Sequence, residues 1–475
     1  MAERSVTAIF DIGKTNKKFL LFDDAMEVVH TSYTTLPETV DDDGYPSENL
    51  DELVSWMFQQ LEEVVSGSSF SIRNLNISTY GASLVHLDRE GRVAAPFYNY
   101  LKPCPEELLE EFYARYGGQE QFALETASPP MGMLNSGLQL YWLRERKPDL
   151  FRDIHTTLHF PQYLASLFTG RYLSELTSIG CHTGLWDFRK WQYHEWLEKE
   201  SFSGLLPPVK TVTTVLDGGY NEERFTTGTG IHDSSSALVP YLYGLNEPFL
   251  LLSTGTWNIA MNPFSQDPLT FEELKKDTLC YINVYGEPVK AARFFLGSEY
   301  AHQKSKIEKQ FGKLQESRPD PGLVDRLVMQ EDISKQVTLE RAHTSGPYPS
   351  PGGDPSGRWD PARFASGEEA HHQLLMDLVS IQADSIRLAL GRGEIRKIVV
   401  TGGFSHNPLF LGLLGARFPD MEVYTDSLSH ASALGAAMVL RDRPASAGEK
   451  LKEQMALKRQ EPLRAGSFHK YRWNP

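Results

Sequence analysis

The stretch from Val6 to Asp23, VTAIFDIGKTNKKFLLFD, places a polar turn that contains glycine between two apolar runs. The apolar runs predict two β-strands, and the turn between them extends from Asp11 to Asn16. Gly13 gives the backbone a freedom that a side chain would restrict, so that the N–H groups of the turn can converge on an anion. An ordinary surface hairpin with solvated lysines explains the same residues, and for this stretch alone it is the better explanation.

A second stretch, Pro248 to Met261 (PFLLLSTGTWNIAM), repeats this arrangement about half a chain later. An apolar run again precedes a small polar turn, Ser253 to Thr256, and another apolar run follows. Gly13 and Gly255 therefore mark two similar predicted hairpins. Two related domains that each offer one hairpin to a shared cleft would produce this spacing.

A third glycine turn lies in the stretch from Lys397 to Asn407, KIVVTGGFSHN. Its apolar run predicts a strand, which leads into Gly402 and Gly403 and then into a helix that we expect to begin near Asn407. The spacing matches neither GxGxxG nor GxxxxGK[ST], so the sequence predicts neither a Rossmann fold nor a P-loop.

The three turns, in this order, resemble the phosphate-1, phosphate-2 and adenosine motifs of the actin-like ATPase superfamily, and more narrowly those of the FGGY carbohydrate kinases. The resemblance covers nearly the whole chain, from Val6 to Leu440. It implies an α/β protein with two ribonuclease H-like domains and a central cleft. We expect an N-terminal domain at 1–240, with the sugar-binding side and the first phosphate hairpin, and a C-terminal domain at 241–475, with the second phosphate hairpin and the adenosine turn.

The stretch from Thr227 to Tyr241, TGTGIHDSSSALVPY, is where we expect the catalytic group. Asp233 stands at the start of a predicted helix, where a carboxylate can also serve simply as an N-cap, and the residues alone leave both roles open. The family holds its catalytic base in a matching Gly-x-x-Asp-x-x-x-Ala stretch, here Gly230 to Ala237, so the resemblance implies that Asp233 is catalytic. The His-Asp pair is most similar to the rhamnulokinase branch, where the histidine contacts sugar, which implies that His232 and Asp233 bind substrate.

The resemblance also implies the ligands of ATP and Mg²⁺. Asp11 is expected to hold hydrated Mg²⁺ against the phosphates. The first and second hairpins would line the two sides of the triphosphate, and the third turn would flank the adenosine. Lys14 stands where family members commonly have threonine. The expected cofactor-binding residues are Asp11, Gly13, Lys14, Thr15, Asn16, Lys18, Thr254, Gly255, Thr256, Gly402, Gly403 and Asn407.

Another glycine turn follows the predicted strand from Asn74 to Tyr80. Ligands of open α/β sheets usually lie at such strand ends, and the matching turn of the sugar kinases contacts the sugar, which implies that Gly81 and Ala82 bind substrate. The chain departs from the family pattern soon afterwards. Asn99 to Lys102 stands where a Trp-Asp-x-Arg stretch often helps to bind the sugar, so we expect a different pattern of hydroxyl groups to be recognised.

Composition narrows the range of partners. A net charge of −15 over 475 residues opposes binding to nucleic acid or to an anionic membrane, and no apolar run approaches the length of a membrane span.

The three cysteines, Cys104, Cys181 and Cys280, lie far apart and suggest neither a disulfide framework nor a zinc site. We expect a cytoplasmic protein that binds a small-molecule sugar, and we leave a homodimer open. The Pro/Gly-rich stretch from 345 to 358 predicts a loop.

Together these features predict an ATP-dependent phosphotransferase with an alcohol group as acceptor. The substrate would be a ketose or deoxyketose, rhamnulose- or fuculose-like, with Asp233 as general base. One alternative is another FGGY kinase, acting on xylulose, ribulose or glycerol. The other is a nucleotide-binding sensor without catalysis, although the presence of both Asp11 and Asp233 favours an enzyme. The sequence does not identify the sugar.

Overall fold

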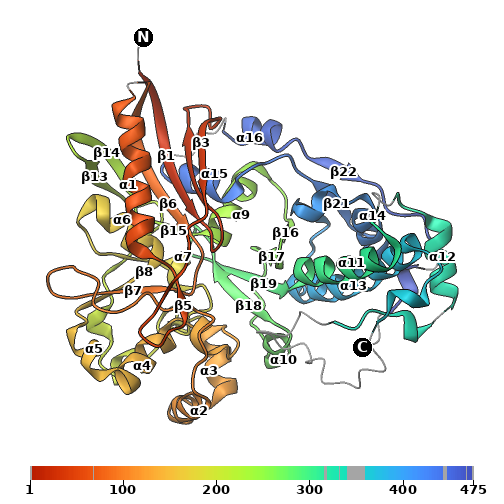
Figure 1. The fold of residues 1–475 in the computed structure, drawn as a ribbon, viewed down its shortest axis with the longest axis horizontal. Coiled ribbons are helices and arrows are strands. Elements are labelled where there is room, and N and C mark those ends of the chain that lie inside the picture. The colour runs from red at the N-terminus through yellow and green to blue at the C-terminus, as the bar shows by residue number, and fades with distance from the viewer. Residues whose placement is uncertain are drawn as a thin grey trace. The chain divides into compact units, whose positions relative to one another are not determined.

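The computed structural model describes residues 3–67, 69–314, 318–330, 332–339, 359–441, 447–466 and 468–472. The chain forms two compact units (Figure 1). The first comprises Met1–Leu245, Cys280–Pro288 and Ser429–Leu451, and the second comprises Asn246–Leu279, Val289–Leu428 and Lys452–Pro475. The first unit therefore contains two segments from the second half of the sequence. The stretch from 345 to 358, predicted as a loop, lies outside the described residues.

A mixed seven-stranded sheet forms the centre of the first unit. Its strands, in spatial order, are β13 (Val215–Tyr220), β14 (Glu223–Gly228), β6 (Phe70–Thr79), β1 (Arg4–Ile12), β2 (Lys17–Phe22) and β3 (Val28–Thr34), and β15 (Ile231–His232) also pairs with β6. Strand β1 is antiparallel to β2 and parallel to β6, so that Asp11 lies opposite both Lys18 and Ser78. The predicted first hairpin is confirmed.

Apolar residues of β1 and β2 hold this sheet against the helices α1 (Leu50–Ser66) and α6 (Phe160–Thr169). The Phe10 and Phe19 rings lie 4.7 Å apart, and both are fully buried. Burying one such side chain contributes roughly 1.5–3 kcal/mol. The core therefore fixes the strands up to the point where the polar turn begins.

Two further helices of this unit, α9 (Asp233–Gly244) and α15 (Ala431–Met438), pack closely on each other. Helix α15 also packs on β1 and β6, and α9 packs on β6. A Cβ atom on Gly435 would lie 1.9 Å from the carbonyl oxygen of Ser236, so glycine is required where the two helices meet. The Asn76 side chain donates a 2.8 Å hydrogen bond from β6 to the carbonyl of Ala436. Residues from the second half of the chain thus complete the first unit.

A second group of helices and short strands follows β6. It contains β7 (Leu84–Leu87), α2 (Glu106–Arg115), α3 (Gln119–Thr126), α4 (Gly137–Arg146), α5 (Pro148–Asp153), β8 (Thr156–His159), α7 (Leu176–Ile179) and α8 (Trp196–Lys199). Their apolar side chains form a separate core, which includes Trp142 and also Ile282 from a later segment.

A second mixed seven-stranded sheet forms the centre of the other unit. Its order is β18 (Thr278–Ile282), β19 (Pro288–Phe294), β17 (Asn258–Asn262), β16 (Leu250–Thr254), β20 (Lys397–Gly402), β21 (Glu422–Thr425) and β22 (Lys458–Gln460). Strand β16 is antiparallel to β17 and parallel to β20, which repeats the pairing of β1 with β2 and β6. The second predicted hairpin is therefore confirmed.

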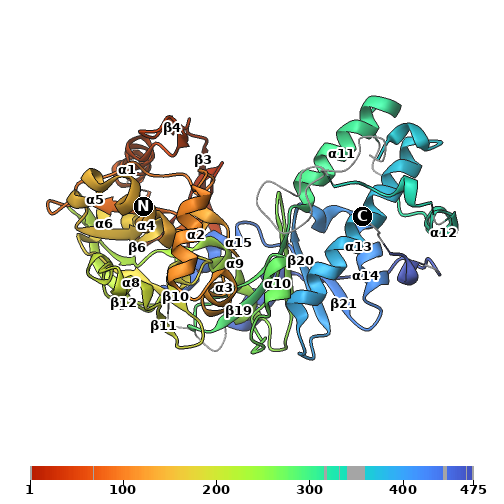
Figure 2. The ribbon, with the colours of Figure 1, turned by 90° about the horizontal axis from the view of Figure 1, so that it is seen from below.

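Helices α11 (Leu296–Phe311), α12 (Pro321–Gln330), α13 (Gly367–Leu390) and α14 (Pro408–Arg417) belong to this unit. Figure 2 shows α13 and α14 beside β20 and β21. The apolar stripe of α13 is buried in the core of this unit. Within the described part of the chain, none of the helices is both long and apolar enough to cross a membrane.

Candidate active site

Three lysines lie in or just after the turn of the first hairpin, and each has a different partner. Lys17 is buried and pairs with Glu48 at 2.8 Å, so it supports the fold. Lys14, which the sequence predicts as a phosphate ligand, donates to Glu38 at 2.7 Å. The Lys18 Nζ lies 3.2 Å from Oδ2 of Asp11, in the position expected of a cation at the site. The turn itself closes through a 3.0 Å hydrogen bond from the N–H of Gly13 to the carbonyl of Asn16.

Asp11 is the second-to-last residue of strand β1, and its carboxylate contacts residues from two other elements. Its Oδ1 accepts a hydrogen bond from the Ser432 hydroxyl at 3.1 Å, its Oδ2 faces Lys18, and Ser432 contacts the Ser78 hydroxyl at 2.6 Å. A carboxylate beside two hydroxyl groups is the oxygen-rich environment that hydrated Mg²⁺ prefers. The residues therefore fit the metal that the sequence predicts.

Another acidic cluster with metal-like spacing, Asp41 to Asp43, has a different role. The Lys102 ammonium group bonds to Asp41 at 2.5 Å and to Asp43 at 2.6 Å, and Lys147 also pairs with this cluster. Lys102 belongs to the stretch that replaces the family's Trp-Asp-x-Arg, and Asn99 of the same stretch donates to the carbonyl of Pro46. This replacement therefore anchors the neighbouring loop.

Asp233 is the first residue of α9, and 34% of its side chain is exposed. The N-cap position belongs to His232, so Asp233 does not serve as the N-cap. Its Oδ1 accepts a hydrogen bond from the Ser234 hydroxyl at 3.2 Å. Burial, followed by the negative charge of Asp11, raises the pKa of Asp233 to about 7. A carboxyl group with this pKa can both accept and release a proton near neutral pH.

His232 is buried beside Asp233. Its Nε2 lies 3.2 Å from Oδ1 of Asp233 and 3.1 Å from Sγ of Cys181. Burial lowers the pKa of His232 to about 3, so the imidazole is neutral at physiological pH. Its backbone N–H donates to the Thr177 hydroxyl at 3.1 Å, and that hydroxyl donates to Glu175. Burial raises the pKa of Glu175 to about 7.

The turn after β6 lies against this histidine. A Cβ atom on Gly81 would lie 2.5 Å from Cys181 Sγ and 3.2 Å from Cδ2 of His232, so this position requires a glycine. Ala82 has a left-handed φ of 61°, and its carbonyl accepts a hydrogen bond from Gln139 at 3.1 Å. The first unit thus brings Gly81, His232 and Asp233 together.

The second hairpin is closely packed against its neighbours in the second unit. The N–H of Gly255 donates to the carbonyl of Trp257 at 3.1 Å. The Thr254 hydroxyl accepts a 3.0 Å hydrogen bond from the N–H of Phe404. Gly402 has a φ of 83°, and a Cβ atom there would lie 1.9 Å from the carbonyl oxygen of Thr254. Thr254 and Gly402 therefore hold the two turns against each other.

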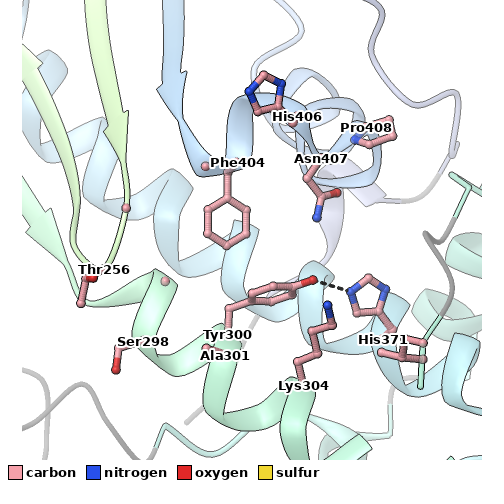
Figure 3. A pocket seen from close by; sticks show the side chains of 14 residues that line it. Thr256, Ser298, Tyr300, Ala301, Lys304, His371, Phe404, His406, Asn407 and Pro408 are labelled. Atoms are coloured by element: carbon pink, nitrogen blue, oxygen red, sulfur yellow. Dashed lines mark hydrogen bonds between the residues drawn. The ribbon is translucent and has the colours of Figure 1, made fainter. Parts of the chain in front are cut away.

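A cavity of about 620 Å³ opens beside these turns, within the range of nucleotide-sized sites (Figure 3). Four of the predicted nucleotide ligands line it: Gly255, Thr256, Gly403 and Asn407. The Asn407 Oδ1 accepts the N–H of Phe410 and so caps α14, while Figure 3 shows its amide directed into the cavity.

The opposite wall comes from α11 and α13. Tyr300 lies between Phe404, whose ring centroid is 5.1 Å away, and His371, whose Nε2 is 3.0 Å from the Tyr300 hydroxyl. Burial lowers the pKa of His371 to about 4. Lys304 directs its ammonium group into the cavity (Figure 3). No glycine turn or motif marks these residues, so sequence reasoning missed them.

Comparison with known families gives matches to both parts of the chain. The N-terminal domain of the FGGY family of carbohydrate kinases matches residues 6–228, and the carbohydrate kinase FGGY C-terminal domain matches residues 246–449. The segment that carries Asp233 lies between the two matched ranges.

Individual relatives share about a quarter of their aligned residues with this chain. A rhamnulokinase from Bacteroides thetaiotaomicron is 26% identical over 211 residues, which is 42% of this chain and 42% of the relative. The chain thus matches less than half the length of this relative. A probable L-xylulose kinase from Pasteurella multocida is 24% identical over 468 residues, covering 90% of this chain and 89% of the relative.

Solved structures share the fold over almost the full length. A carbohydrate kinase from Novosphingobium aromaticivorans superposes with a TM-score of 0.78 at 24% identity, covering 99% of this chain and 98% of the other. A xylulose kinase from Lactobacillus acidophilus gives a TM-score of 0.79 at 15% identity, covering 98% and 96%. At these identities the likeness shows the fold.

Proposed function

This chain belongs to the FGGY family of carbohydrate kinases, and from that premise we propose that it transfers the γ-phosphoryl group of ATP to a hydroxyl group of a ketose or deoxyketose. The observation that carries the proposal is the carboxyl group of Asp233. It is partly exposed, its pKa is raised to about 7, and it lies beside a buried neutral histidine. This is the protonation behaviour that a general base needs at neutral pH.

In the proposed reaction Asp233 accepts the proton of the attacking hydroxyl group. His232, with Gly81 and Ala82 on the neighbouring turn, contacts the sugar. Little covalent chemistry remains for the protein, because phosphoryl transfer depends mainly on positioning and on neutralising charge. Bound Mg²⁺ would supply part of that neutralisation, and Asp11 would hold it through water.

The nucleotide would occupy the cavity of the second unit. Gly255 and Thr256 would contact the phosphates, and Gly403 and Asn407 the adenosine, which is supported by their positions on the cavity wall. Gly13, Thr15 and Asn16 are proposed as further phosphate ligands on the basis of the family resemblance. A phosphate contact by Lys14 has less support, because Lys14 is paired with Glu38. A phosphate contact by Lys18 has more support, because Lys18 faces Asp11. Catalysis requires the sugar and the triphosphate to meet during turnover.

The sugar is proposed from the rhamnulokinase relatives and from the His232–Asp233 pair, which favour a rhamnulose- or fuculose-like ketose. A second candidate is L-xylulose, because the relative that matches 90% of the chain is a probable L-xylulose kinase. The cytoplasmic location, a homodimer and the absence of nucleic-acid or membrane partners stay predictions from the sequence.

A panel of substrates tests the proposal. Purified protein with ATP and Mg²⁺ is offered rhamnulose, fuculose, xylulose, ribulose and glycerol, and ADP release is measured against the rate without sugar. We expect one ketose to raise the rate well above this background. If none does, although ATP binds in a titration, the protein is a nucleotide sensor and the proposed kinase activity is wrong.

A further inference from the structure

A row of polar atoms in the first unit ends at Asp233. The Ser235 hydroxyl lies 2.8 Å from the carbonyl oxygen of Ile282 and 3.3 Å from Nδ1 of His232. On the other side of the ring, Nε2 of His232 lies 3.2 Å from Oδ1 of Asp233. Ser235 and His232 are buried, so water competes little for these hydrogen bonds.

The chemistry of the row fixes the positions of its protons. A carbonyl oxygen can only accept, so the single Ser235 proton points toward Ile282. The Ser235 oxygen can then only accept from the ring, which places a proton on Nδ1 of His232. Because burial keeps this imidazole neutral, Nε2 carries a lone pair and no proton.

That lone pair faces Asp233. While the carboxyl group is ionised, Nε2 and Oδ1 are both acceptors and do not bond to each other. The Cys181 thiol, 3.1 Å from Nε2, can then act as a weak donor. Once Asp233 is protonated, its new O–H can donate to Nε2. The arrangement therefore favours the protonated form of this carboxyl group.

We propose that Ser235 and the Ile282 carbonyl hold His232 as a hydrogen-bond acceptor toward Asp233, so that the proton taken from the sugar is retained by an Asp233–His232 hydrogen bond. The inference rests on the proposed role of Asp233 as general base. The sugar O–H bond breaks and an O–H bond forms on Asp233, while the sugar oxygen bonds to the γ-phosphorus and ADP leaves with the electron pair of the broken P–O bond. Asp233 later releases the proton to water. His232 and Ser235 neither gain nor lose a proton, so they are positioning residues.

Several ionisable groups surround the pair and would influence its titration. Asp11 raises the pKa of Asp233, whereas Lys18 lowers it. The groups next to His232 are Cys181 and Tyr281, whose ring lies 5.3 Å away, and Glu175 is linked through Thr177. The substitutions below leave all of them in place.

Replacing Ser235 with alanine tests the proposal through the pH profile of kcat. Without an acceptor for Nδ1, the ring can move its proton to Nε2, which then donates to the Asp233 carboxylate and stabilises its charge. We expect the acidic limb of the profile to move to lower pH by about one unit, and the plateau kcat to fall by about 3- to 10-fold, since the base is weaker. A purely structural role would lower the melting temperature without moving the limb.

Ser234→Ala is the matched contrast. Ser234 donates directly to Asp233, so its removal takes a hydrogen bond from the ionised carboxylate and should move the limb to higher pH. If both variants move the limb in the same direction, the proposed effect of Ser235 is wrong.

Nitrogen NMR of histidine-labelled protein provides a readout independent of turnover. With the His232 signals assigned from a His232→Gln sample, we expect Nδ1 protonated and Nε2 unprotonated in the wild type, and Nε2 protonated in Ser235→Ala. A protonated Nε2 in the wild type would overturn the inference and leave Asp233 as base untouched. Near-normal turnover of Asp233→Asn would instead contradict the proposed role of Asp233 as general base.

Discussion

Ser432 donates a 3.1 Å hydrogen bond to Asp11, although 421 positions separate them in the sequence. The bond joins the second residue of helix α15 to the second-to-last residue of strand β1. The Asp11 carboxylate is therefore oriented by Ser432, which lies outside all three predicted glycine turns. The orientation of the proposed metal ligand therefore depends on a segment contributed by the second half of the chain.

Asp233→Asn should lower kcat by about 10²- to 10⁴-fold, because the amide cannot accept the proton of the sugar hydroxyl. Nucleotide affinity should be unchanged, since the cavity of about 620 Å³ is lined by other residues. Steady-state kinetics and a calorimetric titration with ATP measure the two effects. Asp384→Asn, at an exposed position of α13, serves as control and should retain wild-type turnover.

The same Asp233→Asn variant should be stabilised at high pH. The folded-state pKa of Asp233, about 7, is above the ordinary value of 3.8, so the folded protein binds more protons than the unfolded chain between these values and loses stability as the pH rises through this window. The asparagine side chain stays neutral, so the variant does not lose stability as the pH rises through this window. Melting temperatures at pH 4 and pH 8 should show a gain for the variant that is larger at pH 8; an equal gain at both would contradict the assigned pKa.

Asp11→Asn should raise the Mg²⁺ concentration needed for half-maximal turnover, because it removes the proposed metal ligand, and it should also alter the pH profile. In the wild type the acidic limb should have its midpoint near the pKa of Asp233, about 7. Removal of the Asp11 charge lowers that pKa, so the limb should move to lower pH. Ser432→Ala keeps the charge and should leave the limb in place. Magnesium titrations at several pH values separate these results.

Gly435→Ala should destabilise the first unit by about 1–3 kcal/mol, because the new methyl group meets backbone rather than a flexible side chain. The added Cβ would lie 1.9 Å from the carbonyl oxygen of Ser236. Gly204→Ala is the matched control, since among the described residues nothing lies within 4 Å of a Cβ atom there. Urea unfolding followed by circular dichroism compares the two variants.

Asn407 has two separable roles. Asn407→Ala removes both the acceptor that caps α14 and the amide that faces the cavity, so it should cost about 1 kcal/mol of stability and weaken nucleotide binding. Asn407→Asp keeps an acceptor for the N–H of Phe410 and should retain the melting temperature while ATP affinity falls about 10-fold. If Asn407→Asp binds ATP normally, the amide does not contact the nucleotide.

Local sequence patterns were sufficient to predict both hairpins, because a strand, a glycine turn and a second strand depend on neighbouring residues. The different roles of Lys17 and Lys18 were not predicted. Successive strand residues point to opposite faces, so this alternation was a usable signal that one lysine faces inward and the other toward Asp11. The partner of Lys17, Glu48, lies outside the hairpin and could not be identified from the pattern.

Residues supplied by tertiary packing could not be predicted. Ser432 and Ile282 reach the surroundings of Asp11 and Asp233 from distant segments, and no periodicity indicates such contacts. Tyr300, Lys304 and His371 line the cavity because α11 and α13 converge there. Their spacing within each helix is compatible with ordinary packing, so only the fold distinguishes them.

The first residues of helix α11 contact the turn of the second hairpin. The N–H of Ser298 donates to the carbonyl of Thr256 at 3.3 Å, and a Cβ atom on Gly297 would lie 1.8 Å from the carbonyl oxygen of Gly255. The same helix carries Tyr300 and Lys304 on the wall of the cavity. One helix therefore contributes both the residues packed against the Gly255 turn and the Lys304 ammonium group, so a shift of α11 would move these two parts of the cavity wall together.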